Sequence, residues 1–170
     1  ANVLVVNASS EVRTLADLIA LAKAKPGKLS YGSIGIGSTV HLAGELLNTE
    51  AGIKVVHVPY KASAQAITDL LSGELTFMFY PYGALAPHIQ AGRLRVLATT
   101  GPQRASYLPQ APTLAESGMP GGVLTVWLAI YGPANMSPRI VSVLYDAIAK
   151  ALADPELVNR KWWRRRAWAS

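Results

Sequence analysis

The sequence contains no cysteine. A disulfide framework and a metal site built on thiolates are therefore both excluded. Long apolar runs are also missing, since no stretch of about 18 apolar residues occurs, and no segment is predicted to insert into a membrane. No basic and then apolar leader precedes Ala1, so we expect a cytosolic, an already processed or a partial chain.

The residues that are present are typical of one globular domain. The chain has 170 residues, 51% of them hydrophobic, with 14 glycines and 11 prolines. This length is sufficient for a substantial core, and this composition is not that of a disordered chain.

Basic charge is concentrated near the carboxyl terminus. The formal net charge is +6, but Arg160, Lys161 and the three arginines at 164–166 supply five of the positive charges, which leaves the rest almost neutral. The segment RKWWRRRAWAS suits a membrane surface or a nucleic acid, and it also suits a poorly packed terminus. We favour the terminus and predict no nucleic-acid partner, because so short a cluster is a weak electrostatic footprint.

Short apolar runs alternate with helical patterns up to Thr100. Strands are predicted at 2–7, 29–31, 54–60, 75–80 and 94–100, and helices at 14–25, 38–51, 63–73 and 84–92, the last with a proline in its first turn. This alternation predicts an α/β fold with a largely parallel sheet and flanking helices. Beyond Thr100, we expect a surface excursion with one helical turn near 113–117, then a strand, and a helix capped by Ser137.

The stretch GSIGIGST, residues 32–39, joins a predicted strand to a predicted helix. Its glycine spacing differs from the dinucleotide fingerprint, and the lysine of a phosphate loop is missing. One interpretation is a site for a small anion, in which backbone N–H groups at the helix start are joined by the hydroxyls of Ser33, Ser38 and Thr39. Neutral donors suit a carboxylate better than a triphosphate. The other interpretation is a tight turn that Ser38 merely caps.

No catalytic or metal-binding set accompanies this stretch. His41 lacks a second histidine at metal-binding spacing, His57 alternates with valines in a predicted strand, and His88 is interpreted as a surface or cap residue. The serine-nucleophile motif is not matched either. We therefore predict neither enzyme activity, nor a cofactor, nor a metal site.

Several linked motifs resemble those of one family. They are LSYGSIGIGSTVHLAGELL, VVHVPYKASAQAITDLLSGEL, PHIQAGRLRVLATTGPQRASYLPQAPTLAESGMPG and ALADPE, in consistent order between about residues 2 and 157. They are similar to the substrate-binding proteins of tripartite tricarboxylate transporters, the Bug-type periplasmic receptors. The resemblance implies a lobe of the periplasmic-binding-protein type II kind, in a two-lobed receptor that captures a small carboxylate in the periplasm and passes it to a membrane permease.

The resemblance also implies which residues bind the ligand. In the family the glycine-rich turn grips the carboxylate, and the matching positions here are Ser33, Gly35, Gly37, Ser38 and Thr39. The family commonly has Phe-Asp-Asn where this chain has Phe79, Tyr80 and Pro81. Because the acid that would meet a ligand amine is missing, we expect Tyr80 to face a plain or aromatic carboxylate rather than an amino acid.

The domain prediction follows from the same resemblance. Residues 1–7 are predicted to be a hinge strand, 8–125 the second ligand-binding lobe, 126–160 a strand and helix that return to an absent first lobe, and 161–170 an atypical tail. Two other functions stay open at this point. One is the effector-sensing lobe of a transcription regulator, and the other is a truncated fragment that binds nothing.

Overall fold

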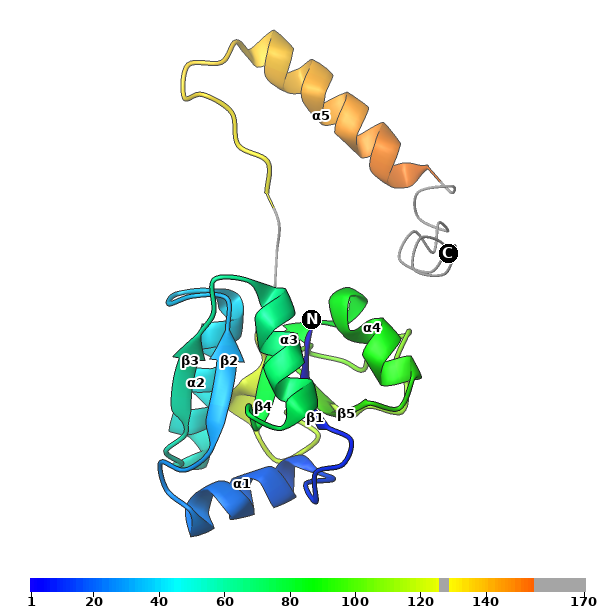
Figure 1. Ribbon diagram of the computed structural model, residues 1–170. Coiled ribbons are helices and arrows are strands. Elements are labelled where there is room, and N and C mark those ends of the chain that lie inside the picture. Colours follow the sequence, from blue (N-terminus) through cyan, green and yellow to red (C-terminus); the bar gives the residue numbers. More distant parts are fainter. Residues whose placement is uncertain (126–128, 155–170) are drawn as a thin grey trace. The chain divides into compact units, whose positions relative to one another are not determined.

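The computed structural model describes residues 1–125 and 129–154 (Figure 1). The chain divides into two compact units, Ala1–Val126 and Trp127–Ser170. The tail predicted at 161–170 lies outside the described residues, as do positions 126–128 and 155–160 of the predicted returning segment. Within the described residues, no helix has the length and apolar character needed to cross a membrane.

One five-stranded sheet organises the first unit. Its strands are β1 (Asn2–Asn7), β2 (Ser30–Ser33), β3 (Val56–Pro59), β4 (Phe77–Pro81) and β5 (Leu94–Thr99), in the order β3-β2-β4-β1-β5. Strand β2 pairs in parallel with β3 and β4, whereas β1 pairs antiparallel with β4 and β5. Four strands therefore run in one direction and β1 runs in the other. The predicted α/β fold is confirmed, with a sheet that is mixed at β1.

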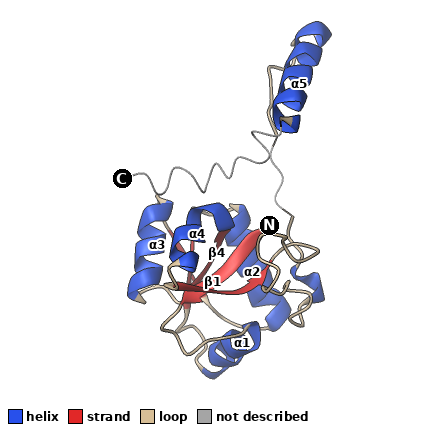
Figure 2. Cartoon of the chain, turned by 90° about the vertical axis from the view of Figure 1, so that its right-hand side faces the viewer, coloured by secondary structure: helices blue, strands red, loops and turns tan. Residues whose placement is uncertain are grey.

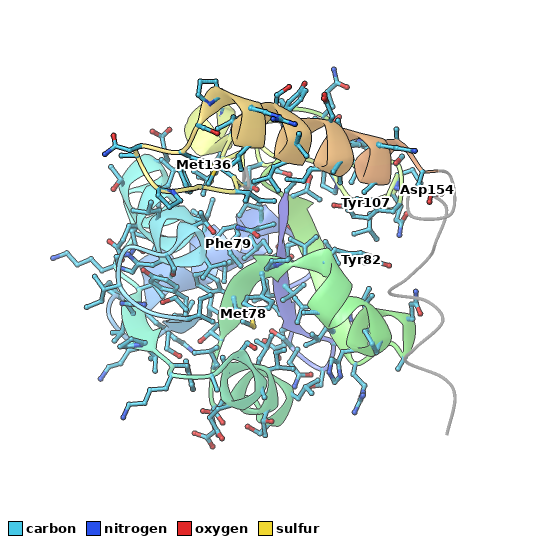
Figure 3. All side chains as sticks on the ribbon, turned by 90° about the horizontal axis from the view of Figure 1, so that it is seen from above. Met78, Phe79, Tyr82, Tyr107, Met136 and Asp154 are labelled. Atoms are coloured by element: carbon cyan, nitrogen blue, oxygen red, sulfur yellow. The ribbon has the colours of Figure 1, made fainter. Side chains whose placement is uncertain are left out.

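Helices cover both faces of this sheet (Figures 1 and 2). Residues of α1 (Leu15–Ala24) and α2 (Thr39–Ala51) share one hydrophobic core, and residues of α3 (Ser63–Ser72) and α4 (Tyr82–Gln90) share the other. The neighbouring β4 residues Phe79 and Met78 belong to the first and second core respectively, on opposite sides of the ribbon in Figure 3. Because both faces are covered, the central strands are apolar throughout rather than alternating with polar residues.

Local capping explains most helix boundaries. Thr14 forms a capping box with Asp17 at the start of α1, and Ser38 caps α2. Gly52 ends α2 with a φ of 61°, a conformation that favours glycine. Helix α4 begins at Tyr82, directly after β4, so Pro87 lies inside it. The prediction of a proline in its first turn was therefore wrong, because the helix starts earlier than the apolar pattern indicates.

The segment after β5 packs along the first unit. Leu114 N–H donates to the Thr99 carbonyl, and Ser117 N–H donates to the Thr113 carbonyl at 3.0 Å, which gives the predicted helical turn. A 3-10 turn, η1, follows at Pro120–Gly122. In the second unit, α5 (Pro138–Ala153) has the predicted Ser137 cap, and none of its residues is buried. The described residues 129–136 contain no strand.

Candidate functional site

The glycine-rich turn lies at the edge of the sheet where the parallel strands end. Strand β2 ends at Ser33, and its neighbour β4 ends at Pro81, which pairs with Asn2 of β1. Helix α2 leads from β2 to β3 on one face of the sheet, whereas α4 leads from β4 to β5 on the other face. The chain therefore leaves the neighbouring strands β2 and β4 on opposite faces of the sheet. Ligands of open α/β sheets bind at such a switch point, outside the carboxyl ends of the strands.

Two glycines give the turn its shape. Gly35 and Gly37 have φ values of 122° and 80°, which residues with a Cβ rarely adopt. An added Cβ would meet nothing within 4 Å at either position, so conformation and not crowding requires glycine. The turn delivers the chain into α2, where the Ser38 hydroxyl donates to the Gly35 carbonyl at 2.7 Å and accepts from His41 N–H at 3.3 Å. Ser38 is therefore a helix cap, as one interpretation of the sequence proposed.

The N–H groups of the turn fall into two sets. Those of Gly35, Gly37 and Ser38 bond within the turn, to Ser33 Oγ, His41 Nδ1 and the Gly35 carbonyl respectively. Those of Thr39 and Val40 have no acceptor in their own helix, and no other group in the described part of the chain accepts from them. Thr39 is exposed. The N–H of Ile36, an exposed residue of the turn, has no acceptor in the described chain either, so the N–H groups that remain for an anion lie at Ile36 and at the start of α2.

Ser33 lies beneath the turn and is completely buried. Its Oγ lies 3.1 Å from both the N and the O of Gly35, and 2.7 Å from Nε2 of His57. The hydroxyl therefore supports the turn from below. Ser33 stays a predicted ligand residue, and direct contact with a ligand requires that it exchange one of these partners.

Two histidines that the sequence analysis set aside lie together under this turn. The ring centroids of His41, on α2, and His57, on β3, are 4.3 Å apart, and His57 also stacks on Tyr31 of β2 at 5.0 Å. Parallel pairing places His57 opposite Tyr31. Only a weak indication of this pair was present in the sequence. His41 lies within three residues of the start of a helix, His57 lies within three residues of the end of a strand, and both of these ends are at the same sheet edge.

The surroundings of His57 disfavour its charged form. Burial lowers the pKa of His57 below its ordinary value, nearby His41 lowers it further, and Glu45 opposes the shift. Burial also raises the pKa of Tyr31 far above its usual range, assisted by the hydrogen bond that its hydroxyl donates to Glu45 Oε1 at 2.6 Å. Within the described residues, no three His, Cys, Asp or Glu side chains are arranged to hold a metal ion.

Two tyrosines complete this edge. Tyr80, near the end of β4, is half-buried and packs against both cores. Because β4 is the neighbour of β2, the structure places Tyr80 at the same edge as the turn. Tyr60, which the sequence analysis did not select, follows β3, and its N–H donates to the Ser33 carbonyl at 2.8 Å. Burial and the hydrogen bond from its hydroxyl to Asp69 raise the pKa of Tyr60 to about 12.

The sequence resembles known proteins over nearly its whole length. Residues 1–161 match the model of a family described as the tripartite tricarboxylate transporter family receptor. The chain is 35% identical to BugT of Bordetella pertussis, over 92% of this chain and 48% of that protein. It is 37% identical to a protein from the tcbD-tcbE intergenic region of a Pseudomonas species, over 93% of this chain and 47% of that protein. The chain thus spans about half the length of the curated relatives it matches.

Solved structures share the fold. R. palustris Rpa4515, solved with adipate, is 36% identical with a TM-score of 0.86, covering 92% of this chain and 52% of that one. The periplasmic binding protein BugD is 27% identical with a TM-score of 0.85, covering 94% of this chain and 53% of that one. These matches confirm the predicted periplasmic-binding-protein type of lobe.

Proposed function

Because the chain belongs to the tripartite tricarboxylate transporter receptor family, which consists of receptors rather than enzymes, we propose that it is the carboxylate-holding lobe of a solute receptor. One observation carries this proposal. At the switch point of the sheet, exposed Thr39 at the start of α2 presents an N–H group without an acceptor in the described chain, and the N–H of the buried Val40 beside it has none either.

The start of α2 has the chemistry that a carboxylate needs. The partial positive charge of a helix N-terminus attracts an anion, and free N–H groups there donate directly to it. Gly37, exposed beside them, has no side chain to obstruct an approaching oxygen. Each hydrogen bond to a charged group contributes about 1.5–3 kcal/mol. Since no lysine or arginine lies between positions 29 and 53, binding stays weak enough for release.

We propose a plain dicarboxylate as the ligand class. The similar protein Rpa4515 was solved with adipate, and this chain has Tyr80 and Pro81 where the family commonly has an acid and an amide. A tyrosine offers a hydroxyl and an apolar ring, and neither group has the negative charge that would form an ion pair with a ligand amine. An unsubstituted chain between two carboxylates therefore suits this edge better than an amino acid.

We further propose that the complete receptor acts in the periplasm and delivers its ligand to a membrane permease. The family match and the likeness to a periplasmic binding protein support this role. Because the chain spans about half of its relatives, a second lobe would supply the other half of the enclosure. The same matches favour a receptor over the effector-sensing lobe of a transcription regulator.

The direct test is the melting temperature of the 170-residue chain with adipate. A single lobe is expected to bind in the millimolar range, since half of the donors belong to the other lobe. At a Kd of about 2 mM, 20 mM adipate stabilises the folded chain by about 1.4 kcal/mol, which raises the melting temperature by roughly 3–5 °C.

The matched control is adipamide at the same concentration, with salt added to equal ionic strength. Adipamide has the same carbon chain but no charge, and it is expected to leave the melting temperature unchanged. Equal melting temperatures with adipate and adipamide would contradict the proposed function.

A further inference from the structure

A short chain of hydrogen bonds connects His57 to the glycine turn. Ser33 Oγ accepts from Gly35 N–H at 3.1 Å, which leaves its single proton for one of two acceptors. One is the Gly35 carbonyl at 3.1 Å, and the other is His57 Nε2 at 2.7 Å. The protonation of His57 decides between them.

With either acceptor, Ser33 Oγ keeps its hydrogen bonds to Gly35 N–H and to His57 Nε2. When Nε2 of His57 carries no proton, the Ser33 hydroxyl donates to it. When Nε2 is protonated, it donates to Ser33 Oγ, and the hydroxyl proton turns to the Gly35 carbonyl. From the neutral tautomer that carries its proton on Nδ1, His57 can therefore take up a second proton at Nε2 and keep its bond to Ser33 Oγ, and the change is passed to Gly35 in the turn.

His41 differs from His57 in this respect. Its Nδ1 accepts from Gly37 N–H at 3.3 Å, so a proton at Nδ1 would break that bond. With ring centroids only 4.3 Å apart, the two imidazoles also cannot both be charged without repulsion. The other titratable groups that face His57 are the Tyr31 phenol on β2 and the Glu45 carboxylate on α2. His57 is therefore the member of the pair that can accept a proton without giving up a hydrogen bond.

Building on the proposed function, we infer that His57 is a positioning residue of the turn. The turn binds a carboxylate more tightly when His57 carries a proton. The positive charge on the imidazole lies directly below the turn and favours an anion above it. Because linkage is reciprocal, the bound anion in turn favours the charged imidazole. In the free chain, burial and His41 lower the pKa of His57 and so disfavour the proton that a bound anion favours.

The expected effect is a carboxylate affinity that increases as the pH falls. An opposite charge within about 6 Å raises a histidine pKa by about one unit or more. One unit corresponds to a factor of ten, so we expect adipate to bind about 3–10-fold more tightly at pH 6 than at pH 8. Aliphatic carboxylates ionise near pH 4–5, so the ligand changes little across this window.

The first experiment needs no ligand. In the isotopically labelled 170-residue chain, the amide resonance of Gly35 and the imidazole resonances of His57 are followed by NMR from pH 8 to pH 5. The two sets are expected to titrate with the same midpoint, and His57→Gln is expected to abolish the titration of Gly35. A Gly35 amide that does not titrate, or that titrates unchanged in H57Q, would overturn the inference.

The second experiment measures adipate affinity at pH 6 and pH 8 by the same method. The wild-type chain is expected to show the 3–10-fold difference, and H57Q a difference below twofold, because glutamine keeps a donor for Ser33 but does not titrate. The control is His88→Gln, whose histidine also has a pKa lowered by burial but has Arg93 as its charged neighbour. H88Q is expected to keep the wild-type ratio.

The outcomes separate the two claims. Equal pH ratios in the wild type and H57Q would overturn the proton-linked role and leave carboxylate binding intact. Absence of adipate binding at both pH values, with Gly35 still titrating with His57, would refute the proposed function. It would leave only the control of the turn by His57.

Discussion

Two glycines in helices have opposite surroundings, and the effect of this difference on stability can be measured. A Cβ on Gly44 of α2 would overlap the ring of Tyr31, whereas a Cβ on Gly83 of α4 would meet nothing within 4 Å. Gly44 therefore lets α2 lie close to β2, beside the histidine pair.

We expect opposite effects of alanine at these two positions. Gly44→Ala forces α2 away from Tyr31 and is expected to lower the free energy of unfolding by about 1–3 kcal/mol. Gly83→Ala adds helix propensity in open space and is expected to raise it by up to about 1 kcal/mol. Urea unfolding of both variants checks this, and equal effects would mean that Gly44 is not a packing position.

The pH dependence of stability is also determined by individual residues. The pKa values of His57 and His88 are both lowered in the folded chain, mainly by burial. The unfolded chain therefore takes up protons first as the pH falls below about 6.5. The contribution of these two histidines to the free energy of unfolding is fully present above that pH and is lost as the pH falls toward the lowered pKa values. Carboxylates such as Asp17 and Glu116, whose pKa values are also lowered, contribute losses only at lower pH.

Urea midpoints at pH 7.5 and pH 5.5 test this expectation. The wild-type midpoint is expected to fall over this interval, and H57Q and H88Q are each expected to show a smaller fall. A wild-type midpoint that rises toward pH 5.5 would contradict the assignment of both histidines.

Those features of the turn whose geometry is local could be predicted from the sequence. One interpretation made Ser38 a helix cap after a tight turn, because capping and turn geometry depend on a few adjacent residues, whereas the role of these residues in ligand binding stays a prediction. The pairing of His41 with His57 was not predicted, because it depends on the register between β2 and β3. The burial of Ser33 depends on the same packing and could not be read from the sequence.

For the helices and strands as well, local features could be predicted from the sequence and long-range features could not. The apolar alternation located all five strands and the helices, but it did not show that β1 runs against its neighbours. Strand direction is set by where the chain enters the sheet, which periodicity does not record. The start of α4 was missed because Pro81, at the end of β4, is followed at once by helix.

One arginine joins the elements at the opposite end of the sheet. The Arg95 guanidinium on β5 donates to the carbonyls of Ala8, Ser10 and Val12, in the loop between β1 and α1. Arg95→Met leaves these carbonyls without their donor and is expected to cost about 1.5–3 kcal/mol of stability.

The matched control is Arg93→Met. Arg93 is exposed, so its loss is expected to change stability by less than about 0.5 kcal/mol. Chemical denaturation compares the two variants, and equal losses would show that the Arg95 bonds contribute nothing beyond an ordinary surface residue.

At the scale of the whole molecule, the two units are unequal. The first contains both hydrophobic cores, whereas no residue of α5 in the second is buried. The domain boundaries predicted from the family, with a hinge strand at 1–7 and a returning segment at 126–160, stay predictions. Sequence similarity identified the family but not the ligand, because the chain spans about half the length of the relatives it matches.

A chain that ends at residue 125 is therefore expected to keep the fold of the first unit. Its cooperative unfolding transition should lie within about 5 °C of that of the 170-residue chain, since a shift of that size corresponds to roughly 1–2 kcal/mol. Circular dichroism during heating measures this. Loss of a cooperative transition in the shorter chain would show that the second unit is part of the core.

An NMR titration of backbone amides detects millimolar binding and can therefore show whether the start of α2 holds a carboxylate. With adipate up to 20 mM, the amides of Gly37, Ser38, Thr39 and Val40 are expected to shift together and approach saturation, while adipamide leaves them in place. Ser38→Ala is expected to weaken the response, because the cap that orders these groups is lost. Shifts that are absent from this segment, or equally large with adipamide, would show that the start of α2 does not hold a carboxylate.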